Sequence, residues 1–236
     1  MTNHICNVKG KGGRDYRLVA MAADFWGDWA IVERNGKWTK LEKSKIYNIR
    51  EGSLVKIDRF KSEDNWQDVK DAAMNTIGKD TGVYPESEWK RKMLLSEHSP
   101  IRRLRFYWRW TELKYWISVH FVRHKIGIEH WVTTQRTDRT GKNRDFARQS
   151  SFVNHACEAD AQALINISRK RLCSQASVET RETWQAVKDE VAKVEPELAS
   201  CMVRECIYRG FCPEMYPCGY SKTEAFKEEL KEYRGE

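Results

Sequence analysis

The stretch from residue 101 to residue 110, IRRLRFYWRW, restricts the fold of this chain more than any other segment. Large apolar and basic side chains alternate along it, and a period of two is typical of a β-strand with one buried face. The residues expected in the core are Leu104, Phe106, Trp108 and Trp110, and those on the opposite face are Arg103, Arg105, Tyr107 and Arg109. The segment therefore predicts a sheet with an aromatic core on one side.

The rest of the chain shows both strand and helix patterns. Residues 1–60 contain short apolar alternations, and Asn35-Gly36 stands between two of them, where it favours a tight hairpin turn. Apolar residues recur every three or four positions from 64 to 77, 86 to 95, 113 to 124 and 177 to 198, which predicts helices, and the composition of 156–172 predicts another. We expect Ser177 to cap the helix at 177–198 and Pro196 to interrupt it.

These patterns predict the α/β class and three regions. A small β appendage or sheet edge occupies residues 1–60, a main domain residues 61–220, and a charged C-terminal tail residues 221–236. Globular units usually contain roughly 100 to 200 residues, so the main domain is large enough to bury a core of its own.

Composition excludes several classes of protein. Of the 236 residues, 40% are hydrophobic and 11% aromatic, which is too rich for a disordered chain. The run from Leu113 to Val122 is interrupted by Lys114 and falls short of the ~18 residues of a membrane helix, so no membrane partner is expected. Because the first residues lack the apolar core of a secretory signal, we expect a cytoplasmic protein with reduced cysteines.

The net charge of +8 suits a phosphate-bearing partner, which could be a nucleotide or a nucleic acid. Basic residues concentrate in the polar stretch 133–150, and a loop of that length is usually functional or disordered, so we interpret it as a mobile lid over an anion. Arginines interleaved with aromatics suit a nucleotide pocket, because guanidinium groups grip phosphates and aromatic rings stack on flat ligands. The same residues would equally suit solvated basic faces around an aromatic core.

Metal-binding and nucleophile motifs are weak in this sequence. Cys201, Cys206, Cys212 and Cys218 lie close together, but structural zinc usually shows shorter ligand spacings, so free thiols are favoured and no metal site is predicted. The sequence has no HExxH, no GxSxG, no Walker loop and no GxGxxG.

Four motifs in order resemble the flavin-dependent thymidylate synthases, whose mark is RHRxxSxNExSxRYS. Arg123-His124-Lys125 is similar to the RHR motif, and Thr134-Gln135-Arg136 follows where the family has Ser-Gln-Arg. His98-Ser99-Pro100 resembles the family's His-x-Ser-Pro segment, and Leu164-Ile165-Asn166 followed by Arg171 resembles its Leu-x-Asn-Phe-Leu-x-Leu-Arg. The resemblance covers about residues 55 to 215.

The resemblance implies a fold, an assembly and a set of ligands. It implies a central, mostly antiparallel sheet flanked by helices, and a homotetramer that binds FAD at subunit interfaces beside the nucleotide. It implies that a one-carbon unit passes from methylenetetrahydrofolate to C5 of dUMP, with NADPH as the reductant, and that no cysteine acts as a nucleophile.

The resemblance also implies roles for individual residues. Arg171 would be catalytic, by polarising the pyrimidine as an oxyanion-hole donor does. The residues that would contact FAD are Arg123, His124, Lys125, Asn166, His98 and Ser99, and those that would contact the nucleotide are Arg136, Gln135, His120, Gln162 and Arg171. On an ideal helix Asn166 and Arg171 lie about 140° apart, so ligands that contact both must wrap around the helix.

Several positions depart from the family pattern. Lys125 replaces the second arginine of RHR, Ile128 stands where serine is expected, and Gln162 stands where an arginine is expected. These departures affect the substrate more than the flavin. Two alternatives therefore remain beside dUMP methylation: a related enzyme that modifies another pyrimidine, free or in a polynucleotide, and a non-catalytic nucleic-acid-binding relative.

Overall fold

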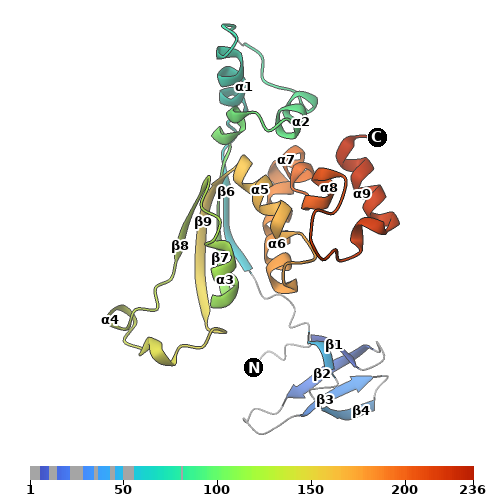
Figure 1. Cartoon of the computed structure of the whole chain (residues 1–236). Helices are drawn as coiled ribbons and strands as arrows, with labels where there is room; N and C mark the ends of the chain where they lie inside the picture. Colours follow the sequence, from blue (N-terminus) through green and yellow to red (C-terminus); the bar gives the residue numbers. More distant parts are fainter. Residues whose placement is uncertain are drawn as a thin grey trace. The chain divides into compact units, whose positions relative to one another are not determined.

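The computed structural model describes residues 6–10, 15–21, 29–34, 37–42, 46–49, 56–80 and 82–236. The chain divides into two compact units, Met1–Leu54 and Val55–Glu236 (Figure 1).

The N-terminal unit is an antiparallel sheet. Its strands are β1 (Cys6–Gly10), β2 (Asp15–Met21), β3 (Trp29–Arg34), β4 (Lys37–Glu42) and β5 (Ile46–Ile49), in the order β4-β3-β2-β1-β5. β3 and β4 pair up to Arg34 and Lys37, which flank the expected Asn-Gly turn. The two turn residues themselves lie outside the described residues.

The second unit contains a four-stranded antiparallel sheet. Its strands are β6 (Lys56–Ser62), β7 (Arg105–Lys114), β8 (Ile128–Val132) and β9 (Phe152–Asp160), in the order β6-β7-β9-β8. Because β6 pairs with β7 along Lys56–Ser62, residues 56–60 belong to this sheet, although the sequence pattern placed them in the N-terminal appendage.

Helices make up most of the remaining chain. The α-helices are α1 (Trp66–Asn75), α2 (Ser87–Leu95), α3 (Tyr115–Phe121), α4 (Thr137–Thr140), α5 (Ala161–Arg171), α6 (Val178–Val194), α7 (Pro196–Cys201), α8 (Glu205–Arg209) and α9 (Glu224–Arg234). Short 3-10 helices span Ser99–Arg103, Arg144–Phe146 and Tyr220–Lys222. No helix in the described part of the chain has the length and apolar character that a bilayer crossing requires.

The aromatic residues of β7 build the core, as their alternation predicts. Trp108 and Trp110 are fully buried, and their rings meet Trp184 of α6 and Phe121 of α3 with centroids 5.8 and 4.7 Å apart. α3 and α6 therefore cover the apolar face of the sheet. The opposite face carries ion pairs such as Arg105 with Glu158. The expected α/β fold around an antiparallel sheet is confirmed.

Two predicted element boundaries are wrong. The strand expected from residue 101 begins at Arg105, because Ser99–Arg103 forms a 3-10 helix that starts with Pro100 in its first turn. The helix expected from residue 156 begins at Ala161, because Phe152–Asp160 is strand β9. The Asp160 carboxylate accepts a hydrogen bond from the Ala163 N–H and caps the helix there.

Strand β7 contains an irregularity near its end. The register with β9 shifts between Trp110 and Leu113, and Glu112 has a φ of 57°, which is unusual for a residue other than glycine. This bulge lets both Trp110 and Leu113 face the core, where each is fully buried. Helix α3 follows directly.

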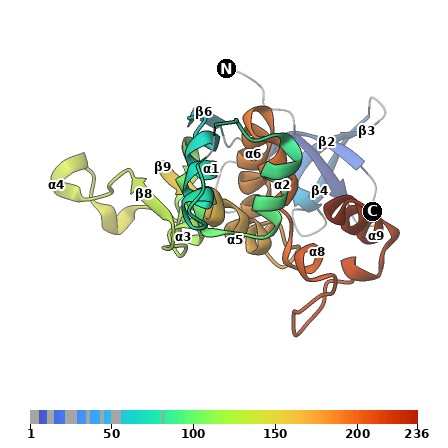
Figure 2. The same ribbon diagram turned by 90° about the horizontal axis from the view of Figure 1, so that it is seen from above.

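The segment between β8 and β9 forms an arm that extends away from the helices in both views (Figures 1 and 2). It carries α4 and the exposed side chain of Phe146, and its two ends carry the exposed rings of Trp131 and Phe152. This arm contains the basic stretch 133–150 that the sequence analysis interpreted as a lid.

The C-terminal residues form a docked helix. α9 buries Phe226 against Val203 and Ile207, and the backbone carbonyl of Tyr233 accepts a hydrogen bond from Arg91 at 2.6 Å. The segment that the sequence analysis treated as a charged tail is thus in contact with the main domain.

Candidate functional site

A group of basic side chains gathers where helix α5 ends beside the turn that follows α3. Arg171 is the last residue of α5, and Arg123 and His124 lie in the turn between α3 and β8. Arg171 Nε donates to His124 Nε2 at 2.8 Å, and its Nη2 donates to the His120 carbonyl at 2.6 Å. We call His120, Arg123, His124 and Arg171 the arginine cluster.

The hydrogen bond from Arg171 fixes the charge state of His124. An arginine N–H can only donate, so His124 Nε2 must accept and the ring is neutral. The pKa of His124 is lowered to about 4, chiefly by burial. The positive charge of Arg171 and the neighbouring His130 lower it further. Burial likewise lowers the pKa of His120, and the charges of Arg171 and Arg123 lower it further.

The two guanidinium groups of the arginine cluster have no carboxylate as an ion-pair partner among the described residues, and the nearest charge effect of an acid is that of Glu179 on His120. Neither Arg123 nor Arg171 forms an ion pair with any carboxylate of the described residues, although Arg171 is half-buried. Burial lowers the pKa of Arg171, and the neighbouring charge of Arg123 lowers it further. Two guanidinium groups of like charge held close together without an acid are suited to bind an anionic or electron-rich ligand.

The geometry of the turn depends on Gly127. Its φ is +71°, and a Cβ atom at this position would lie 2.6 Å from Asp160 Oδ2. The Gly127 carbonyl also accepts a hydrogen bond from the Asp160 N–H at 2.9 Å. Only glycine combines this conformation with this close approach, so Gly127 joins the turn to the start of α5.

A second group lies on the other side of α5. Gln162 Nε2 donates to Glu97 Oε2 at 2.5 Å, Arg169 forms an ion pair with the same carboxylate, and Arg169 Nη1 donates to Asn166 Oδ1 at 3.1 Å. The Arg169 guanidinium also stacks over Tyr208, with 3.5 Å from Cζ to the ring centroid. We call Glu97, Gln162, Asn166 and Arg169 the glutamate cluster.

The structure therefore brings together some of the residues singled out from the sequence and leaves others apart. His120, Arg123, His124 and Arg171 meet in one cluster, and Gln162 and Asn166 meet in the other. Gln135 and Arg136 lie on the arm, where Arg136 forms an exposed ion pair with Asp138. Lys125, His98 and Ser99 are exposed and belong to neither cluster.

Sequence reasoning missed Glu97, which is central to the second cluster. It precedes the His98-Ser99-Pro100 segment and has a φ of 50°, a strained conformation of the kind found at functional sites. Its partners are 65 and 72 residues away along the chain, so no local pattern could reveal them.

The four clustered cysteines of the sequence do not form one group. Cys201 is buried in the main core, whereas Cys206, Cys212 and Cys218 line a pocket together with Cys173. Burial raises the pKa of Cys206 to about 11, which favours its thiol form.

The fold is that of the flavin-dependent thymidylate synthases. Among solved structures, the chain is similar to thymidylate synthase X from Helicobacter pylori with FAD and dUMP, at 13% identity and a TM-score of 0.50 over 63% of this chain and 98% of that one. It is also similar to PolB, a UMP/dUMP methylase from Streptomyces cacaoi bound with 5-Br dUMP, at 13% identity and a TM-score of 0.50 over 67% of this chain and 95% of that one. No sequence-family description matches the chain, and no curated protein matches it by sequence.

Proposed function

We propose that this chain is a cytoplasmic flavin-dependent thymidylate synthase, which transfers a one-carbon unit from methylenetetrahydrofolate to C5 of dUMP with NADPH as reductant. The observation that carries the proposal is the arginine cluster. Arg171 is half-buried and held by a neutral histidine and a backbone carbonyl, beside Arg123 and without a described carboxylate to neutralise it. The shared fold and the order of the sequence motifs support the same proposal.

The residues of the arginine cluster would have different roles in binding and catalysis. Arg123 and His124 would bind FAD, and Lys125, Asn166, His98 and Ser99 would add contacts to it. When bound, FAD would supply the hydride that completes the methyl group. Arg171 would donate to a carbonyl oxygen of the pyrimidine and stabilise the negative charge that develops there. His120 would orient Arg171 through its backbone carbonyl.

The arm suggests how the remaining residues could reach a site. Gln135 and Arg136, which would bind the nucleotide, lie on the arm, and the arm extends away from the helices in both views. We propose that copies of the chain assemble, as a tetramer, so that the arm of one copy completes the site of another. The arm and its two ends carry three exposed aromatic side chains, which supports a role in contacts between copies. Their exposed fractions are 53% for Trp131, 84% for Phe146 and 60% for Phe152.

The experiment that tests the proposed function starts from the colour of the purified protein. We expect yellow protein that releases FAD on denaturation and makes dTMP from dUMP, methylenetetrahydrofolate and NADPH in the absence of oxygen. Colourless protein that makes no dTMP, while a control enzyme does, would contradict the proposal. If that protein instead bound DNA with a steep salt dependence, the non-catalytic nucleic-acid-binding alternative would replace it.

UMP is a second candidate substrate. Gln162 replaces the arginine expected at a nucleotide contact, and it is already bonded to Glu97, so the substrate pocket differs from the family pattern. One of the similar structures is a methylase of both UMP and dUMP. Parallel assays with the two nucleotides would separate the candidates, because a mass gain on UMP alone would exclude thymidylate synthesis.

A further inference from the structure

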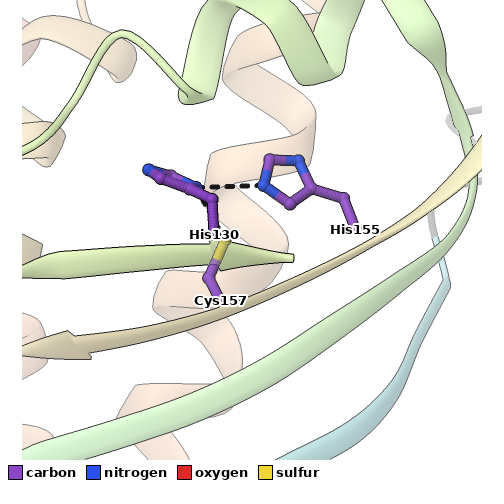
Figure 3. A group of neighbouring side chains, drawn as sticks. All are labelled: His130, His155 and Cys157. Carbon is purple, nitrogen blue, oxygen red and sulfur yellow. Dashed lines mark hydrogen bonds between the residues drawn. The ribbon is translucent and has the colours of Figure 1, made fainter. Parts of the chain in front are cut away.

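Three side chains that can bind a metal meet between β8 and β9, on the face of the sheet that the helices cover (Figure 3). His130 lies directly opposite Cys157 in the register of the two strands, and His155 precedes Cys157 by two residues, so all three share one face. His155 and Cys157 are fully buried, and His130 is half-buried. One donor atom from each residue lies within 4.8 Å of the other two.

Two of the three distances between these atoms are close to those of a tetrahedral metal site. His130 Nδ1 is 3.0 Å from His155 Nε2 and 3.3 Å from Cys157 Sγ. Zinc bonds of roughly 2.0–2.1 Å to nitrogen and 2.3 Å to sulfur place neighbouring ligand atoms roughly 3.3–3.6 Å apart. The two distances from His130 Nδ1 are within a few tenths of an ångström of these values, and the remaining pair of donor atoms lies within 4.8 Å, so modest shifts of the side chains would admit an ion.

The surrounding hydrogen bonds orient the ligand atoms inward. His130 Nε2 is 2.8 Å from the His124 carbonyl, which can only accept, so Nε2 carries the proton and Nδ1 presents its lone pair to Cys157 and His155. His155 Nδ1 is 3.1 Å from Ser118 Oγ of α3, which holds the second ring. Metal-bound histidines almost always have such partners on the nitrogen that faces away from the ion.

The donor types select the class of metal. Two imidazole nitrogens and one sulfur suit zinc and related transition metals, whereas magnesium and calcium require oxygen ligands. The group contains no carboxylate. Three protein ligands leave a fourth tetrahedral position for water, an arrangement that zinc adopts in proteins.

We propose that His130, His155 and Cys157 bind one zinc ion, or a divalent transition-metal ion of similar preference. On binding, the Cys157 thiol releases its proton to solvent and its sulfur bonds to the ion. The proton between the two histidines moves to His155 Nδ1, which then donates to Ser118 Oγ. One proton leaves the protein for each ion bound.

A bound ion would have a consequence for the arginine cluster. It would tie β8 to β9, and the bond from His130 to the His124 carbonyl would tie the turn that carries Arg123 and His124 to the same point. The proposed metal site does not depend on the proposed function, because its three ligand atoms are defined by their distances from one another.

The test uses cobalt as a probe, because cobalt takes the place of zinc and reports a sulfur ligand by its absorption. We expect the untagged full-length protein, freed of metal with a chelator, to bind Co²⁺ with a sulfur-to-cobalt band, and Zn²⁺ to displace it. Cys157→Ser should abolish the band, and His130→Gln should weaken Co²⁺ binding at least about 10-fold. Ser118→Ala, which leaves all three ligands in place, should weaken binding about 10- to 100-fold.

Cys218→Ser is the matched control, because Cys218 is an exposed cysteine of the other group. It should leave the band unchanged, and circular dichroism should show that every variant is folded. If the wild-type protein showed no band, the proposal would be overturned. His130, His155 and Cys157 would then be a buried, hydrogen-bonded group that binds no metal. A band that survives Cys157→Ser but disappears in Cys218→Ser would also overturn it, and would place the metal beside Cys173, Cys206 and Cys212.

Discussion

Two arginines near the end of helix α5, Arg169 and Arg171, differ in what neutralises them. Arg169 is largely buried, forms an ion pair with Glu97 and stacks on Tyr208. Arg171 is half-buried, and its hydrogen bonds go to a neutral histidine and a backbone carbonyl. Burying a charge is costly unless it is paired. The charge of Arg169 is therefore balanced within the fold by Glu97, whereas Arg171 is available to a ligand.

The largest effect expected from this difference concerns turnover. Arg171→Ala should lower kcat for dTMP formation about 10²- to 10³-fold, as loss of one oxyanion-hole donor does, while FAD stays bound. Anaerobic turnover and the flavin absorption of the same preparation measure both effects. Arg209→Ala, which removes an exposed arginine paired with Glu205, is the control and should turn over normally. Lost FAD or an unchanged rate would show that Arg171 does not act on the pyrimidine.

The other arginine should affect stability more than chemistry. Arg169→Ala leaves the Glu97 carboxylate largely buried, with Gln162 as its one remaining partner among the described residues, so we expect the free energy of unfolding to fall by about 3 kcal/mol. Urea unfolding of Arg169→Ala and Arg171→Ala side by side measures the contrast. If both variants lost the same stability, the two arginines would not differ in the way described.

Gly127 tests the turn that presents the arginine cluster. Gly127→Ala forces a Cβ against the Asp160 carboxylate in a left-handed conformation, so we expect a loss of about 2 kcal/mol and weaker FAD binding. Gly141→Ala has the same sign of φ but open space around the new Cβ, and it should cost about 1 kcal/mol with FAD binding unchanged. If the two variants bound FAD with equal affinity, the conformation of the turn at Gly127 would not affect FAD binding.

The last effect is a pH dependence of stability from the neutral histidine beside Arg171, and it is spread over more than two pH units. The pKa of His124 is about 4 in the folded chain and ~6.5 in an unfolded one, so the unfolded state binds more protons between these values. The free energy of unfolding should therefore be highest above pH ~6.5 and fall as the pH is lowered toward 4. Urea unfolding at several pH values would show a shallower slope in His124→Gln; an identical slope would contradict the assignment.

The sequence predicted an element of the fold correctly where apolar side chains recurred at a regular spacing over enough residues. Leu104, Phe106, Trp108 and Trp110 alternate over four inward positions, and all four are buried. The pattern in β9 was harder to recognise, because its inward positions are Val153, His155, Cys157 and Ala159, which include a polar ring and small side chains. A helix was expected from Ala156 onward, so the sequence did not reveal that His155 and Cys157 share one face of a strand.

The candidate site was predictable only in part, for a related reason. The resemblance singled out His120, Arg123, His124 and Arg171, which meet in the fold. It could not reveal that Arg169 is neutralised and Arg171 is not, because that depends on Glu97, which lies 72 residues before Arg169 and takes part through tertiary contacts. The roles proposed for Gln135 and Arg136 require contacts between copies of the chain, and such contacts cannot be derived from the sequence of a single chain.

The bulge in β7 means that this strand contains one residue more than its pleat requires. With Glu112 set aside, Trp110, Thr111 and Leu113 already alternate inward, outward and inward, so a shorter chain could keep the same tryptophan and leucine in the core. Deletion of Glu112 should thus be tolerated, whereas insertion of a residue beside it would turn Leu113 toward the charged face. Length variation among relatives at this point should accordingly favour loss over gain.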